Sequence, residues 1–208
     1  MGRDESGALV MRINTAKNSV FKAVIAGLAA LIMAMALAGC SKDASMGMDH
    51  EGHSSMASGD LSGDDIMFLQ MMIPHHEQAI EMSKLAATNT TNPAVLDLAA
   101  RIEAAQQPEI ELMQKLLSDA GQSSMPGHSM GDNGMMNESD MAVLSATKDT
   151  EFDVLYLTGM VAHHNGAITM AREVSESSNS DVKTLANNII TSQATEIAEM
   201  TKLLAAAS

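Results

Sequence analysis

Met72-Ile73-Pro74-His75-His76 recurs later in the chain as Met160-Val161-Ala162-His163-His164. The match continues on both sides of this motif, and a second matching segment follows each copy after a one-residue deletion. These later segments share the pattern Gln-x-x-Glu-Ile-x-x-Met, which begins at Gln106 and at Gln193. An internal repeat of this length indicates two copies of one supersecondary unit, so the repeat decides the architecture.

The first copy is predicted to form a helical hairpin. Apolar residues recur at helical spacing over about 66–87, and Ser62 with Asp65 resembles a capping box. An Asn/Thr run then breaks the helix, Pro93 suits the first turn of the next helix, and Gly121 marks its end. The hairpin is apolar on one face only, and that face must be buried against another element.

The second copy repeats this pattern. It predicts helices over about 150–176 and 181–206, with Ser180 as the cap of the latter, and a short preceding helix over 140–146. Two hairpins bury their apolar faces by pairing, so we expect an all-α four-helix bundle. The bundle domain is expected over 61–206, with repeat 1 over 61–120, a linker over 121–138 and repeat 2 over 139–206.

Composition supports helices and limits the classes of partner. The chain has 208 residues, with 20 Met, three Phe, one Tyr and no Trp, whereas strands draw on aromatic and β-branched residues. Its formal net charge of −14 argues against nucleic-acid binding and favours attraction of cations. A single cysteine excludes an internal disulfide.

The leader before that cysteine resembles a bacterial lipoprotein signal peptide. Basic residues from Arg12 to Lys22 precede an apolar run over 23–36, which leads into Leu37-Ala38-Gly39-Cys40. We therefore expect residues 1–39 to be removed and Cys40 to carry a lipid that anchors the chain to a membrane. The alternative is an uncleaved anchor, and either arrangement places the remainder outside the cytoplasm, on the periplasmic or cell-surface side.

Two segments combine linker composition with metal-binding side chains. Residues 40–60 are rich in Ser, Gly and Asp and are expected to form a flexible tether. The tether and the 121–138 linker interleave thioethers with imidazoles, and the candidate residues are Met46, Met48, His50, His53, Met125, His128 and Met130. An ordinary linker is the simpler interpretation, but Met is a poor choice for a solvated segment, so we expect accessory metal capture.

The paired histidines are predicted to face the bundle interior. With Met72 at the centre of the apolar face, His75 falls about 60° to one side and His76 about 40° to the other. Gln106 and Glu109 fall on the apolar face of the partner helix. Polar groups buried without partners cost about 1–3 kcal/mol each, so these side chains require either one another or a metal ion. A closed hydrogen-bond network and a metal site are the two alternatives.

Ligand chemistry favours copper if a metal binds. The candidate ligands are Met72, His75, His76, Met82, Glu109, Met113, Met160, His163, His164, Met170, Glu196 and Met200. Thioethers select Cu(I), Ag(I) behaves similarly, and imidazole also accepts Cu(II). For Met113 and Met200 core filler is the favoured alternative, because Met is a common gap filler. The sequence lacks the Glu-x-x-His motif of di-iron bundles, the thiolates of zinc fingers and the Cys-x-x-Cys-His motif of haem attachment.

These motifs carry a family resemblance. Met-x-x-His-His followed by Ala and Met, then Gln-x-x-Glu-Ile-x-x-Met, resembles the bacterial domain-of-unknown-function family numbered 305, over roughly 61–206. The resemblance implies an exported, ferritin-like helical bundle, some members of which bind copper or silver through Met and His. Pro74 stands where the second copy has Ala162, and a proline inside a helix predicts a kink or bulge just ahead of His75.

The resulting hypothesis is an envelope-anchored copper protein for sequestration, tolerance or transfer, without turnover. A copper-transfer protein is the corresponding expected partner. Two alternatives belong to other classes. One is a copper-dependent redox enzyme, although no catalytic constellation stands out and aromatic residues are nearly absent. The other is a structural or partner-binding helical domain without metal.

Overall fold

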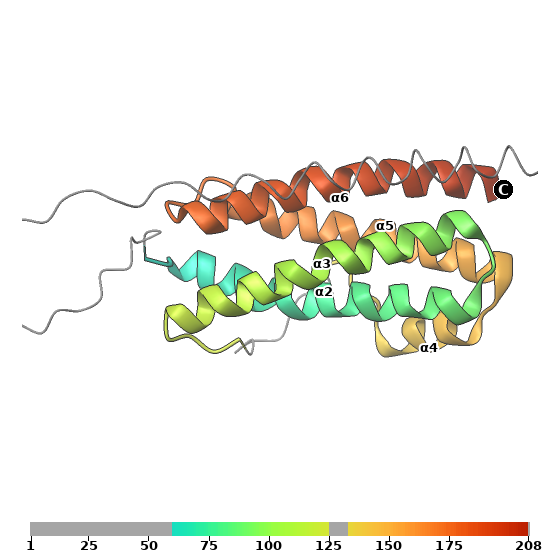
Figure 1. Ribbon diagram of the computed structural model, residues 1–208, viewed down its shortest axis with the longest axis horizontal. Helices are drawn as coiled ribbons and strands as arrows, with labels where there is room; N and C mark the ends of the chain where they lie inside the picture. Colours follow the sequence, from blue (N-terminus) through green and yellow to red (C-terminus); the bar gives the residue numbers. More distant parts are fainter. Residues whose placement is uncertain (1–59, 125–132, 208) are drawn as a thin grey trace, which may run out of the picture. The chain divides into compact units, whose positions relative to one another are not determined.

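A computed structural model describes residues 60–124 and 133–207. Within these residues the chain forms five helices and no strand (Figure 1). They are α2 (Gly63–Asn89), α3 (Pro93–Asp119), α4 (Glu138–Ala146), α5 (Asp149–Glu173) and α6 (Ser180–Ala207). The prediction of an all-α bundle made of two repeated hairpins is confirmed. The leader with Cys40, the tether and the linker candidates Met125, His128 and Met130 lie outside the described residues.

Local sequence signals set most of the helix ends. Ser62 Oγ accepts the Asp65 N–H at 3.1 Å, and the Asp65 carboxylate accepts the Ser62 N–H at 2.9 Å, which completes the capping box of α2. Pro93 occupies the first turn of α3, as expected, behind the capping side chain of Asn92.

Three local predictions need correction. The cap of α6 is Asn179 rather than Ser180, because Asn179 Oδ1 accepts the N–H groups of Asp181 and Val182, each at 3.1 Å. Helix α5 ends at Glu173, three residues before the predicted end, where the chain turns toward Asn179. Helix α2 stays α-helical through Pro74, so of the expected kink or bulge ahead of His75 the bulge does not form, and the kink stays a prediction.

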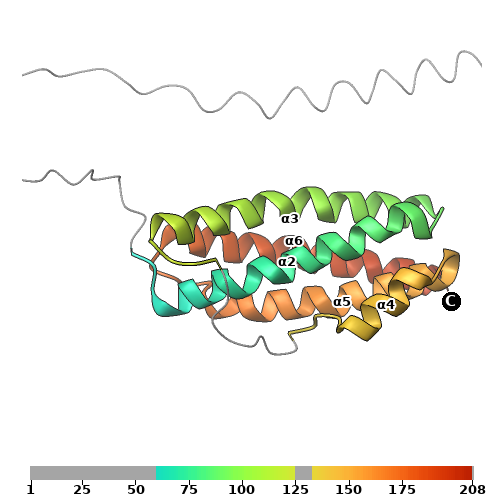
Figure 2. The same cartoon turned by 90° about the horizontal axis from the view of Figure 1, so that it is seen from below.

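The four long helices run side by side, and the two hairpins meet along the helices that carry the histidines. Helix α2 packs against α3 and α5 packs against α6 within each hairpin, whereas α2 and α5 form the main contact between hairpins (Figure 2). The short α4 lies against α2 and α5. None of the helices in the described ranges combines the length and hydropathy of a membrane span.

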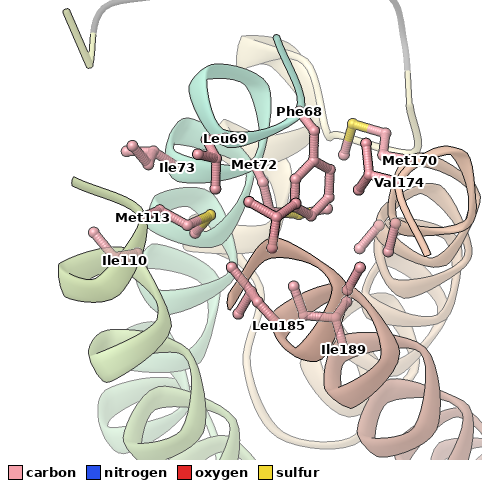
Figure 3. Close-up of a cluster of buried hydrophobic side chains, with 14 of the residues drawn as sticks. Phe68, Leu69, Met72, Ile73, Ile110, Met113, Met170, Val174, Leu185 and Ile189 are labelled. Carbon is pink, nitrogen blue, oxygen red and sulfur yellow. The ribbon is translucent and has the colours of Figure 1, made fainter. Parts of the chain in front are cut away.

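The apolar core is divided into two clusters. The first core cluster joins the N-terminal halves of α2 and α6 to the C-terminal halves of α3 and α5, and includes Phe68, Met72, Met113, Met170 and Leu185 (Figure 3). The second core cluster occupies the other half and includes Met82, Ile102, Phe152, Met160 and Met200. Each long helix also carries inward-facing polar side chains between the two clusters, and these side chains form the candidate site.

Candidate metal centre

A polar layer crosses the bundle between the two core clusters. Each long helix contributes two side chains to it: His75 and His76 from α2, Gln106 and Glu109 from α3, His163 and His164 from α5, and Gln193 and Glu196 from α6. All four histidines are at most 1% exposed, so the predicted inward orientation is correct for each of them. The sequence repeat therefore becomes a nearly symmetric ring of polar groups inside an apolar core.

One histidine of each pair is bonded to a glutamate within its own hairpin. His76 Nε2–H donates to Glu109 Oε2 at 2.7 Å, and His164 Nε2–H donates to Glu196 Oε2 at 2.7 Å. Both imidazoles are fully buried, whereas the Glu109 and Glu196 side chains are 20% and 13% exposed. The glutamates thus lie at the rim of the polar layer, and their hydrogen bonds fix the orientation of the two buried imidazole rings.

The other two histidines meet across the interface between the hairpins. The ring centroids of His75 and His163 are 3.8 Å apart, with an angle of 41° between the ring planes. His75 Nε2–H donates to the backbone carbonyl of Asn133 at 3.0 Å. Each hairpin therefore supplies one member of a close imidazole pair, and neither hairpin can build this pair alone.

These hydrogen bonds decide which ring nitrogen keeps a lone pair. Carbonyl and carboxylate oxygens only accept, so His75, His76 and His164 carry their proton on Nε2. In the neutral ring this leaves Nδ1 as an electron-pair donor, and a carboxylate behind a histidine is a common way to fix a metal-binding tautomer. The Nδ1 atoms of all four histidines are buried and have no hydrogen-bond partner among the protein atoms of the described residues.

The polar layer does not close into a complete hydrogen-bond network through the protein atoms of the described residues alone. Besides the ring nitrogens, both amide atoms of Gln106, Oε1 of Gln193 and Nε2 of His163 lack a hydrogen-bond partner in the described chain. Each buried unpaired group costs about 1–3 kcal/mol. Buried polar groups without protein partners are satisfied by ordered water or by a ligand, so the layer can accept either.

Burial keeps the central imidazoles neutral. Desolvation lowers the pKa of His75 from 6.5 to about 4, and the neighbouring His76 and His164 act in the same direction, against the raising effect of the Asn133 hydrogen bond. Desolvation also lowers the pKa of His163 well below its ordinary value, with further lowering by His75, His164 and His76. At neutral pH these rings offer lone pairs with almost no competition from protons.

The methionine candidates are buried on both sides of the layer. Met72, Met113 and Met170 belong to the first core cluster, and Met82, Met160 and Met200 belong to the second. All six are therefore packed as core side chains, and their role as ligands stays a prediction. Within residues 60–124 and 133–207, no group of three or more His, Cys, Asp or Glu side chains is arranged to hold a metal ion. A metal bound here needs either thioether ligands or a small rearrangement of the rings.

Residues 133–136 pack against α2 and α5, and we call this segment the strap. It belongs to the predicted linker, and the sequence did not predict this packing. Gln78 fixes the strap by donating to the Met136 carbonyl and accepting the Met136 N–H, each at 2.8 Å. A Cβ atom on Gly166 would lie 1.6 Å from the Asn133 carbonyl oxygen, and one on Gly134 would lie 2.2 Å from the Ala162 oxygen. The strap thus touches the backbone of α5, and Asn133 closes the site over His75. The one available signal was glycine inside a helix, which is unfavourable unless a close approach requires it.

Gly166→Ala is expected to detach this strap. Alanine normally stabilises a helix by up to about 1 kcal/mol over glycine, but here the added methyl group would overlap the backbone carbonyl oxygen of Asn133, so the strap must shift. We expect a net loss of about 1–3 kcal/mol in the free energy of unfolding, measured by urea denaturation. Gly63→Ala is the matched control, because nothing lies within 4 Å of its Cβ position. Stabilisation by both substitutions would contradict the packing of the strap.

Comparison with known proteins places this site in a family. A family model described as Domain of unknown function (DUF305) matches residues 65–204. A DUF305 fragment from Deinococcus radiodurans is 26% identical, with a TM-score of 0.66 over 71% of this chain and 99% of that one. A putative secreted DUF305 protein from Streptomyces coelicolor is 30% identical, with a TM-score of 0.66 over 69% of this chain and 92% of that one.

A third relative has been solved in metal-bound forms. CopM in the Cu(I)-bound form is 27% identical, with a TM-score of 0.57 over 67% of this chain and 94% of that one. Further CopM structures are described as Cu(II)-bound and Ag-bound. An uncharacterized protein of Acanthamoeba polyphaga mimivirus is 43% identical over 56 residues, and this match spans 37% of that curated relative's length. The family model covers the whole helical bundle, and the chain therefore belongs to the DUF305 family.

Proposed function

We propose that this protein binds Cu(I) in the polar layer of its bundle and holds it for sequestration, tolerance or transfer, without catalytic turnover. The observation that carries the proposal is the set of four buried histidines whose Nδ1 atoms lack partners, three of them oriented by Nε2–H bonds to oxygen atoms. Neutral imidazole is a good ligand for copper in either valence, and the adjoining thioethers favour Cu(I) and Ag(I).

The His75–His163 pair is the proposed centre of the site. These rings contact each other across the hairpin interface, so a small separation of the rings would let both bind one Cu(I) ion, which is satisfied by fewer ligands than Cu(II). The methionines packed on both sides of the layer favour a soft ion over zinc or iron. Glu109 and Glu196 orient His76 and His164 from the rim, so we assign them an indirect role rather than direct ligation.

The relatives support copper as the cargo. CopM, which shares the fold and about a quarter of its residues with this chain, is described in Cu(I)-, Cu(II)- and Ag-bound forms. The leader resembles a lipoprotein signal peptide, which supports a location in the cell envelope with Cys40 as the proposed membrane anchor. In that setting the protein would capture copper outside the cytoplasm and pass it to a copper-transfer partner.

Copper-dependent stabilisation tests the proposal. A ligand that binds only the folded chain raises the free energy of unfolding by about 2.7 kcal/mol when its free concentration is 100 times the dissociation constant. We therefore expect Cu(I), and Ag(I) as its redox-stable substitute, to raise the thermal midpoint of the purified chain. Mg²⁺ at the same concentration is the control, because it prefers oxygen ligands. No shift with Cu(I) or Ag(I) would favour the purely structural helical domain.

A further inference from the structure

A pocket of about 360 Å³ opens beside the polar layer, between the first turns of α2 and the last turns of α5. Three thioethers line it, from Met67 and Met71 on α2 and Met170 on α5. Met67 and Met71 are four residues apart, so they lie on the same side of α2. Met67 is 47% exposed, which is unusual for a side chain whose ordinary role is to fill a core.

Packing accounts for Met71, which is partly buried against the first core cluster, but not for the exposed Met67. The repeat aligns Met67 with Leu155 and Met71 with Gly159, so the second copy has no thioether at either position. At Gly159 the strap covers the helix instead, because the sulfur and Cε of Met136 lie 3.2 Å from the Cβ position of that glycine. Among the described residues, the strap therefore covers one of the two repeat-related surfaces, whereas the other carries the pocket with its methionines.

Charge around the pocket favours a cation. The carboxylates of Asp64 and Glu173 line the pocket, and both residues are exposed. Neither takes part in any ion pair found within the described residues. Uncompensated carboxylates beside a concave surface raise the local concentration of cations, and thioether donors select soft ones.

The pocket adjoins the histidine site through the strap. Asn133 forms part of the pocket wall, and its carbonyl oxygen accepts the hydrogen bond from His75 at 3.0 Å. Phe68, Met170 and Val174 form another part of the wall and also belong to the first core cluster, where they lie close together (Figure 3). An ion in the pocket would therefore stand on the outer side of Asn133, with the His75–His163 pair on the inner side.

We propose that Met67, Met71 and Met170 form an entry site for a soft monovalent cation, Cu(I) or Ag(I). Asp64 and Glu173 attract the ion, the thioethers hold it, and displacement of Asn133 from His75 lets it pass to the imidazole pair. The transfer exchanges thioether ligands for imidazole ligands and needs no change of valence. The passage inward rests on the function proposed above, whereas binding in the pocket does not.

Methionine methyl resonances test binding in the pocket directly. The full chain is labelled with ¹³C at the methionine methyl groups and titrated with Ag(I), and Met67→Leu, Met71→Leu and Met170→Leu variants assign the three signals. We expect these three signals to shift together, both in the native chain and in a His75→Ala/His163→Ala chain that lacks the inner pair. Pocket signals that stay unchanged at Ag(I) concentrations that shift other methionines would overturn the entry site.

Loading kinetics test the passage inward. In a Met67→Leu/Met71→Leu chain the pocket loses two of its sulfurs but keeps its carboxylates, and we expect Cu(I) uptake from a chelator complex to slow because thioethers select soft cations. Met141→Leu is the matched control, because Met141 is a partly buried methionine packed against the second core cluster. Equal uptake rates in the native and double-variant chains would overturn the entry role. If the native chain shows no tight Cu(I) binding at all, that result would instead refute the inner site.

Discussion

Replacing His75 and His163 together with alanine is expected to lower the affinity of the bundle for Cu(I) by more than about 100-fold, the upper range for removal of an outer-sphere partner of a metal ligand. The reason is geometric, because these two rings are the pair that joins the hairpins at a centroid separation of 3.8 Å. Removing both leaves the outer rings His76 and His164 in separate hairpins, each bonded to its own glutamate. The measurement is a Cu(I) titration of the purified chain against a competing chelator.

Two companion variants keep this test interpretable. His50→Ala/His53→Ala removes the same number of imidazoles from the predicted tether, and we expect this variant to bind Cu(I) as tightly as the native chain. Glu109→Gln keeps the shape of the rim but weakens the acceptor for His76, and we expect a loss of roughly tenfold. Unfolding curves show whether each chain is folded. A folded His75→Ala/His163→Ala chain that binds Cu(I) as tightly as the native chain would remove the imidazole pair from the proposal.

Stability of the metal-free chain is expected to fall as the pH is lowered from 6.5 toward 4. The pKa of His75 is about 4 in the folded chain and 6.5 in the unfolded chain, so the unfolded chain binds more protons throughout this window. The stability associated with neutral His75 is complete above pH 6.5 and is lost toward pH 4, at a cost of roughly 3 kcal/mol. The lowered pKa of His163 acts in the same direction.

Urea unfolding at a series of pH values between 7 and 4.5 measures this loss. In His75→Gln the amide N–H can still donate to the Asn133 carbonyl, but the side chain no longer titrates, so we expect a clearly shallower decline of stability with falling pH. His53→Gln serves as the control, because it removes a histidine from the predicted tether. A decline as steep in His75→Gln as in the native chain would show that His75 is not the residue responsible.

Many features of the fold were predictable because they depend on local signals. The capping box at Ser62, the proline in the first turn of α3 and the apolar spacing around each histidine pair act over one or two turns. The repeat extended these signals to a second hairpin. The errors are local as well. Asn179 caps α6 in place of Ser180, and α2 continues through Pro74 without a bulge.

The candidate site was predictable only in part. Helical spacing placed His75, His76, His163 and His164 inside the bundle, and all four are buried. The pairing of His76 with Glu109 follows from the hairpin, since the repeat places a glutamate on the facing helix in both copies. The linker gave no signal that Asn133 would fold back over His75, because that contact depends on the surface of a helix distant in sequence.

The sequence by itself therefore determined the duplicated hairpins, the inward direction of the histidines and the polar pair on each facing helix, because a helix of period 3.6 converts spacing into direction. Only the tertiary structure decided which imidazoles meet, which nitrogen atoms are left without partners and where the strap lies over them. The physical reason is that the contact of α2 with α5 joins residues far apart along the chain, and its geometry depends on how two complete hairpins pack.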